Sequence, residues 1–183
     1  MNRGFWISLF ALLVCAAPAS RAEEVVVDFE QAEIGKPKPN WTEKGVVFSL
    51  AGALTQSKAA GRIMFFPHLA TNHKGLLNAM ATEQAVPVQA TLPGNASAVT
   101  VVFWGSTGCP ALLEALDRKG DVIDSASVAA VPGRKAPADP IPFLKLSVKA
   151  PQGSAIAAVR FSGPRNGEFL AADEIRFTTV DGL

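Results

Sequence analysis

The sequence predicts an all-β domain, and three observations support this prediction. Short apolar segments recur along the chain and are separated by Gly, Pro, Asn and Asp, which usually mark the turns between strands. Several segments alternate apolar and polar residues, as a strand with one buried and one solvated face does. No stretch of about a dozen residues repeats apolar side chains at helical spacing.

The predicted strands follow one another at short intervals. Their expected positions are 25–29, 45–50, 62–66, 76–80, 88–92, 98–104, 111–117, 122–127, 143–149, 155–161 and 168–178. The alternation is clearest in two of them. Val99, Val101 and Phe103 form one row within 98–104, and Leu or Val alternates with Lys or Ser over 144–149. Each of these strands therefore has one face suited to a core.

Two segments between the predicted strands have compositions that predict a turn and a surface loop. Asp117-Arg118-Lys119-Gly120 predicts a turn, so 111–117 and 122–127 are expected to form a hairpin. Residues 131–142 contain four prolines and cannot pair within a central strand. We expect this second segment to be a surface loop, which either takes part in recognition or only connects the two layers.

The first 22 residues have the three parts of a secretory signal peptide. Arg3 supplies the positive charge, residues 5–17 are apolar, and Ser20 and Ala22 are the small residues that a signal peptidase reads. The apolar stretch is shorter than the about 20 residues that span a bilayer, which disfavours an uncleaved anchor. We therefore expect residues 1–22 to be removed and residues 23–183 to form an extracytoplasmic domain, either periplasmic or secreted.

A lipoprotein signal modified at Cys15 is the other alternative for the N-terminus. Val14 disfavours it, because such signals usually carry a small residue at that place. Loss of Arg3 and Arg21 with the signal would leave 15 basic against 16 acidic residues, a net charge of −1. Without a basic surplus, neither nucleic acid nor stable membrane insertion is expected.

Several short motifs together resemble the exported bacterial jelly-roll domains of the galactose-binding-like and carbohydrate-binding-module type. The motifs are Val27-Asp28-Phe29-Glu30, Gly45-Val46-Val47-Phe48-Ser49, the Val-x-Phe-Trp-Gly strand at 101–105, the segment 113–120, Val159-Arg160-Phe161-Ser162-Gly163 and the closing segment 171–177. The resemblance implies a two-sheet jelly-roll β-sandwich. Many such relatives end in a sorting helix with a Pro-Glu-Pro motif, and we expect none here because the sequence stops at Leu183, just after the last predicted strand.

Four carboxylates at the two ends of the domain are candidate metal ligands. Asp28 and Glu30 are two residues apart in the first predicted strand, and Asp173 and Glu174 lie in the last. The resemblance implies that these strands are neighbours and that a structural calcium ion sits between them, since Ca²⁺ prefers oxygen ligands. In the alternative, Asp28 and Asp173 accept hydrogen bonds from turn amides, and Glu30 and Glu174 face solvent.

Trp41 and Trp104 are the candidate ligand-binding residues. A sugar packs its C–H groups against an exposed aromatic face, and relatives of this type usually present Trp and Tyr for this purpose. The domain has these two Trp residues and no Tyr. Trp104 lies on the face opposite Val101 and Phe103, so we expect it to point outward. The alternative for both indoles is burial.

No catalytic motif accompanies these residues. His68 and His73 are the only imidazoles, and their spacing of five does not place them together on a helix. We therefore expect no enzyme activity. The leading hypothesis is an exported, non-catalytic module that binds carbohydrate, with a structural calcium ion. The alternative is a structural or protein-interaction module of the cell envelope, and an extracytoplasmic hydrolase ranks third.

Overall fold

The computed structural model describes residues 22–51, 63–68, 71, 73–78, 86–136, 139–162 and 170–180. Among these residues there are eleven strands and no helix. The strands are β1 (Glu24–Val27), β2 (Asn40–Glu43), β3 (Val46–Leu50), β4 (Ile63–Pro67), β5 (Lys74–Asn78), β6 (Val88–Gly105), β7 (Ala111–Leu116), β8 (Val122–Val128), β9 (Leu144–Lys149), β10 (Ile156–Ser162) and β11 (Leu170–Thr179). The signal peptide expected at the N-terminus lies outside the described residues, apart from Ala22.

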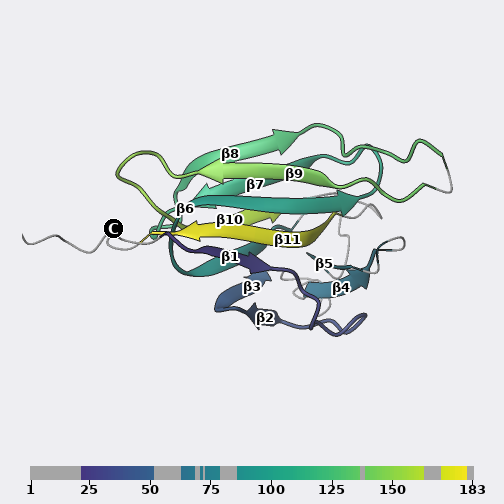
Figure 1. Ribbon diagram of the computed structural model, residues 1–183, viewed down its shortest axis with the longest axis horizontal. Coiled ribbons are helices and arrows are strands. Elements are labelled where there is room, and N and C mark those ends of the chain that lie inside the picture. The colour runs from purple at the N-terminus through teal and green to yellow at the C-terminus, as the bar shows by residue number, and fades with distance from the viewer. Residues whose placement is uncertain are drawn as a thin grey trace, which may run out of the picture.

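The strands form two antiparallel layers that share β6 (Figure 1). In one layer the order is β2-β3-β6-β10-β7-β8, with the first part of β6 paired to β3 and β10. In the other, the second part of β6 lies between β9 and β11. Both β1 and β5 pair with the far edge of β11, and β4 follows β5. The predicted all-β sandwich is confirmed.

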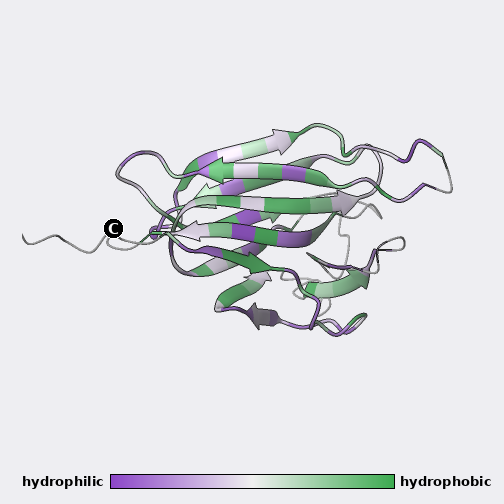
Figure 2. Ribbon diagram, viewed as in Figure 1, coloured by the Kyte–Doolittle hydropathy of each residue, from purple (hydrophilic) through white to green (hydrophobic). Residues whose placement is uncertain are grey.

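The core lies between the layers, where alternate residues of each strand point inward. Figure 2 shows the resulting alternation of hydrophobic and hydrophilic residues along β9 and β11. Val99, Val101 and Phe103 are fully buried, as their alternation predicts. Phe103 of β6 meets Phe161 of β10 with ring centroids 5.6 Å apart, which joins the two layers. This burial provides the main stabilisation of the sandwich.

The hairpin predicted at Asp117-Arg118-Lys119-Gly120 is confirmed. Strands β7 and β8 pair antiparallel, and Gly120 N donates to Asp117 O at 3.1 Å. The Asp117 carboxylate also accepts from the backbone N–H groups of Lys119 and Asp121. Gly120 has a φ of 87°, a conformation that glycine adopts without strain.

Two strands differ from the prediction. The turn residues around Pro93 and Gly94 predicted a break between two strands, but β6 runs through them and passes there from one layer to the other. The polar edge strand β2 was not predicted, because it is short and follows Pro37 and Pro39. In both cases pairing with neighbouring strands outweighs local turn preference.

The proline-rich loop between β8 and β9 is fixed at its start by backbone contacts. Val131 N donates to Cys109 O at 2.7 Å, and Gly108 N donates to Val131 O at 3.0 Å. Gly133 then packs so closely on Thr107 that a Cβ at this position would lie 2.4 Å from the Thr107 methyl group. The described part of the loop contains no strand, as predicted. Within the described residues, no helix could cross a membrane.

Candidate functional site

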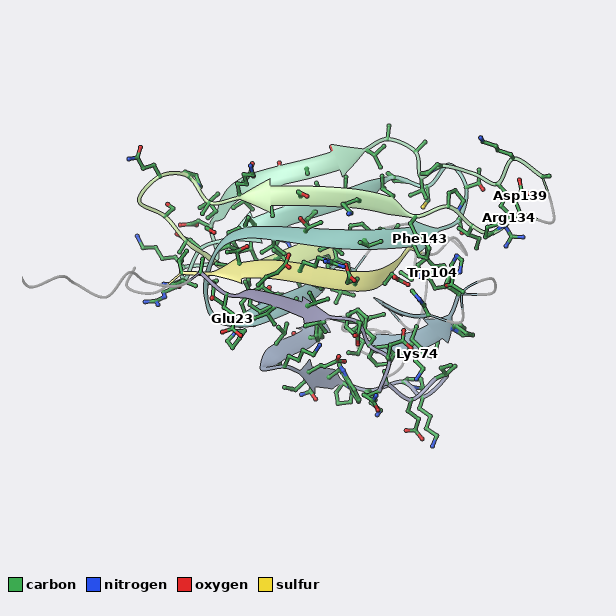
Figure 3. All side chains as sticks on the ribbon, in the orientation of Figure 1. Glu23, Lys74, Trp104, Arg134, Asp139 and Phe143 are labelled. Carbon is green, nitrogen blue, oxygen red and sulfur yellow. The ribbon has the colours of Figure 1, made fainter. Side chains whose placement is uncertain are left out.

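One end of the β9-β6-β11 layer carries an apolar row on its outer face. Trp104 pairs with Ala171 across β6 and β11, and Phe66 pairs with Gly75 across β4 and β5. Phe143 immediately precedes Leu144, the residue of β9 that pairs with Phe103, and therefore adjoins Trp104. The side chains of Trp104 and Phe143 lie at the same end of the molecule, opposite the end that holds Glu23 (Figure 3).

The Trp104 indole packs against the two smallest residues of this row, Gly75 and Ala171. A Cβ built on Gly75 would be 2.8 Å from the indole Cζ2 and 2.7 Å from the Cβ of Ala171. Trp104 and Ala171 form a small apolar cluster with Ile141 that is separate from the main core. Trp104 therefore points to the outer side of the sheet, as its position in the alternation predicts.

His68 covers the Trp104 ring. The two rings meet edge to face with centroids 5.1 Å apart, and His68 also stacks on Phe143 at 4.8 Å with an interplanar angle of 26°. His68 Nε2 donates to the carbonyl of Ile141 at 3.0 Å, and the Thr71 hydroxyl lies 2.9 Å from Nδ1. Because Trp104 is only 3% exposed, the expectation that it offers an open platform is wrong.

A carboxylate and a second imidazole lie beside these rings. Asp173 is placed by a bulge in β11, where the register with β6 shifts between Ala172 and Glu174. Its Oδ2 is 3.4 Å from Nδ1 of His73, whose ring tilts toward Phe143 at a centroid distance of 6.4 Å. We call the five residues His68, His73, Trp104, Phe143 and Asp173 the histidine–aromatic cluster.

Accessibility differs sharply within the histidine–aromatic cluster. Phe143 is 40% exposed, and the side chain of His73 is 54% exposed. The Asp173 side chain is only 9% exposed, and its burial raises the pKa of the carboxyl group, although the hydrogen bond with His73 acts in the opposite direction. The cluster thus presents one open aromatic ring and one open imidazole above a nearly buried carboxylate.

Trp41, the other predicted platform, lies on the edge strand β2 and is half-buried. Its ring meets Phe65 edge to face with centroids 5.3 Å apart, and Lys38 Nζ lies 4.6 Å from the ring centroid. Its Nε1 donates to the Glu43 carboxylate at 3.3 Å. These contacts hold the indole against the sandwich, with the Lys38 ammonium over the ring.

The structure places β1 beside β11, as the predicted calcium site requires, with Val27 paired to Ile175. Three of the four carboxylates nevertheless have separate partners. Asp28 accepts from Glu30 N at 3.3 Å, Asp173 contacts His73, and Glu174 pairs with Arg176. Among the described residues, no three His, Cys, Asp or Glu side chains lie where they could hold a metal ion. The calcium site therefore has no support from side-chain geometry and stays a prediction.

The sequence predicts only two members of the histidine–aromatic cluster as site residues, Trp104 for a ligand and Asp173 for a metal ion. It does not predict that His68, His73 and Phe143 join them. The usable signal was the segment Ile141-Pro142-Phe143, an apolar stretch at the end of a proline-rich loop. Which loops meet there depends on the strand order, which local sequence does not determine.

Comparisons with known proteins identify the fold. No family model matches the sequence, and no curated protein matches it. The K2 cleaved adhesin domain of Lys-gingipain has a TM-score of 0.53 and 13% identity, with 86% of this chain and 100% of that domain covered. The family 29 carbohydrate-binding module CBM29_1 from Piromyces equi has a TM-score of 0.52 and 12% identity, with coverages of 88% and 95%.

A third structure, the K1 cleaved adhesin domain of Lys-gingipain from Porphyromonas gingivalis W83, has a TM-score of 0.52 and 11% identity, with coverages of 87% and 99%. At such identities the likeness concerns the fold alone. The chain has the β-sandwich fold that these carbohydrate-binding and adhesin domains share.

Proposed function

We propose that this protein is an exported, non-catalytic module that binds carbohydrate at the histidine–aromatic cluster. The observation that carries the proposal is the Phe143 ring, which is 40% exposed and held in place by stacking on buried His68. A ring fixed in this way offers a preformed apolar surface, so a ligand does not have to order it on binding.

Polar groups beside the ring suit a sugar. The C–H groups of a pyranose pack on an aromatic face, while nearby donors and acceptors fix its hydroxyl groups. The exposed imidazole of His73, whose Nδ1 faces Asp173, offers its Nε2, and the Asp173 carboxylate provides acceptors. No nucleophile or second acid is needed for this role.

The comparisons support the proposal at the level of fold, because one of the similar structures is described as a carbohydrate-binding module. Export is part of the proposal and rests on the signal-peptide features of residues 1–22. The leading alternative is an envelope protein that binds another protein, since two of the similar structures are adhesin domains.

A glycan array followed by calorimetry on the purified protein tests the proposal. We expect Phe143→Ala to weaken binding of an array-positive glycan by about tenfold or more, because the stacking surface is lost. Val122→Ala is the matched control, since Val122 is an exposed apolar residue on the distant strand β8. Thermal unfolding of both variants shows whether the fold is intact.

Three results would count against this assignment. Equal affinity of Phe143→Ala and the unchanged protein would place the site elsewhere. Loss of binding in Trp41→Ala alone would move it to β2. If no glycan binds and a protein partner is recovered reproducibly with residues of this face at the interface, the envelope-protein alternative replaces the proposal.

A further inference from the structure

The Asp173 carboxylate has acceptor capacity that the protein does not use. Its Oδ1 is buried and, within the described residues, has no hydrogen-bond partner, although nearly all buried polar atoms in proteins have one. Its Oδ2 has only the contact with His73, which at 3.4 Å is long for a hydrogen bond. A buried acceptor without a donor lowers the stability of the fold, and a ligand that supplies the donor removes this loss.

The charge of this carboxylate is also uncompensated by lysine or arginine in the described structure. The groups that act on it electrostatically are His73, His68 and a second carboxylate, Glu174. The neighbouring cations have other partners, since Lys74 Nζ donates to the carbonyl of Glu30 and Arg176 pairs with Glu174. A ligand that brings a positive charge would therefore gain more here than a neutral one.

A metal ion fits this position poorly. Both ring nitrogens of His68 already have partners, Ile141 O and the Thr71 hydroxyl. This leaves one imidazole, His73, and one carboxylate, Asp173, which is fewer than the three or four protein ligands of typical metal sites. Within the described part of the chain, no larger group of metal-binding side chains exists.

An organic ammonium group fits better, because an aromatic ring lies beside the carboxylate. Cations bind to aromatic faces as well as to carboxylates, and the combination selects an ammonium over a hydroxyl group. The His73 ring has its centroid 6.4 Å from that of Phe143 and its Nδ1 3.4 Å from Asp173 Oδ2, so it marks a position between these two residues. The His73 side chain is 54% exposed and its contact with Asp173 is long at 3.4 Å, so displacing it costs little.

We propose that the carbohydrate bound at the histidine–aromatic cluster is an amino sugar, and that its ammonium group takes the place of the His73 ring between Asp173 and Phe143. This inference rests on the proposed function and specifies its ligand class. Rotation of the Asp173 carboxylate about χ2, a broad torsion, allows either oxygen to meet the ammonium group.

The test compares two oligosaccharides of equal length by calorimetry with the purified protein. One is a β-1,4-linked glucosamine oligomer with free amino groups, and the other is its fully N-acetylated form. At a pH where the amino groups are protonated and Asp173 is ionised, we expect the amino form to bind about tenfold more tightly or better. Asp173→Asn should abolish this preference, so that the two oligomers bind this variant with equal affinity.

Two further variants separate this interaction from general charge effects and from misfolding. Asp121→Asn removes the same charge from an exposed carboxylate in the β7–β8 turn and should retain the preference. His73→Ala should also retain it, because the contact between the ammonium group and Asp173 does not need the imidazole. Thermal unfolding of each variant confirms that the fold is intact.

The outcomes separate the two proposals. Equal binding of both oligomers through Phe143 would overturn the amino-sugar inference and leave the carbohydrate function standing. A preference that survives Asp173→Asn, or that His73→Ala removes, would also overturn the inference. Binding of neither these oligomers nor any arrayed glycan would refute the carbohydrate function itself. If the protein binds Nα-acetyl-lysine amide, which has a free ε-amino group, and binds no glycan, both proposals are overturned in favour of a protein ligand.

Discussion

Replacing Gly75 with alanine tests the packing that holds Trp104 over the outer face of the sheet. The added Cβ would lie 2.7 Å from the Cβ of Ala171 and 2.8 Å from Cζ2 and Nε1 of Trp104. Carbon atoms in good contact are about 3.5 to 4.0 Å apart, so the methyl group overlaps both neighbours by roughly 1 Å. Ala171 belongs to a paired strand and cannot move away alone.

Two opposing effects determine how far Gly75→Ala changes the free energy of unfolding. Alanine in a strand is normally more stable than glycine by about 0.5 to 1 kcal/mol, because glycine loses more backbone entropy on folding. Overpacking costs about 1 to 3 kcal/mol. We therefore expect Gly75→Ala to reduce the free energy of unfolding by about 1 to 2 kcal/mol. For a protein of this size the Tm would fall by about 2 to 8 °C.

Thermal unfolding followed by circular dichroism measures this change. Gly94→Ala is the matched control, since Gly94 lies in β6 and a Cβ there would meet nothing within 4 Å. The control should be neutral or slightly stabilising. Combining Gly75→Ala with Trp104→Phe should recover part of the loss, because the smaller ring removes the indole contacts. If both glycine variants behave alike, the position assigned to the Trp104 ring is wrong.

Three further predictions follow from other parts of the structure. Burial raises the pKa of Asp173, so the folded state binds the carboxyl proton more tightly than the unfolded state does. The free energy of unfolding should therefore fall as the pH rises from the ordinary aspartate range through the raised pKa. Asp173→Asn should remove this fall from a plot of Tm against pH, and an unchanged profile would contradict the reasoning. Phe103→Ala should cost about 3 to 5 kcal/mol in denaturant unfolding, because the ring is fully buried against Phe161; a loss below about 1 kcal/mol would refute the assigned core. The separate partners of Asp28, Asp173 and Glu174 predict that neither EDTA nor added calcium changes the Tm, whereas a rise with calcium that Asp28→Ala abolishes would support the calcium hypothesis.

The fold was largely predictable from the sequence because most of its strands have clear local sequence patterns. The alternation of 144–149 and the turn at 117–120 each depend on residues that are close together in the chain, and both are confirmed. The corner in β6 could not be predicted in this way. Pro93 and Gly94 favour a turn, and only the pairing of β6 with four other strands shows that the chain continues through them.

The candidate site was much harder to predict because its residues come from four separate segments. Alternation places Trp104 on the outer side of its strand, and this is correct. Its exposure depends on His68 and the segment around Ile141, whose approach follows from strand order and loop path. Likewise, Asp173 is directed to His73 by a bulge that has no clear local signal.

The strand β6 joins the two layers by covalent bonds as well as by packing. Neighbouring strands flank it on both sides along most of its length, β3 and β10 first and then β9 and β11. Sliding one layer past the other would therefore require breaking the ladder on both sides of a single continuous segment. The amide protons of β6 should be among the last to exchange with solvent. Under a pulling force this strand would hold the two layers of the molecule together.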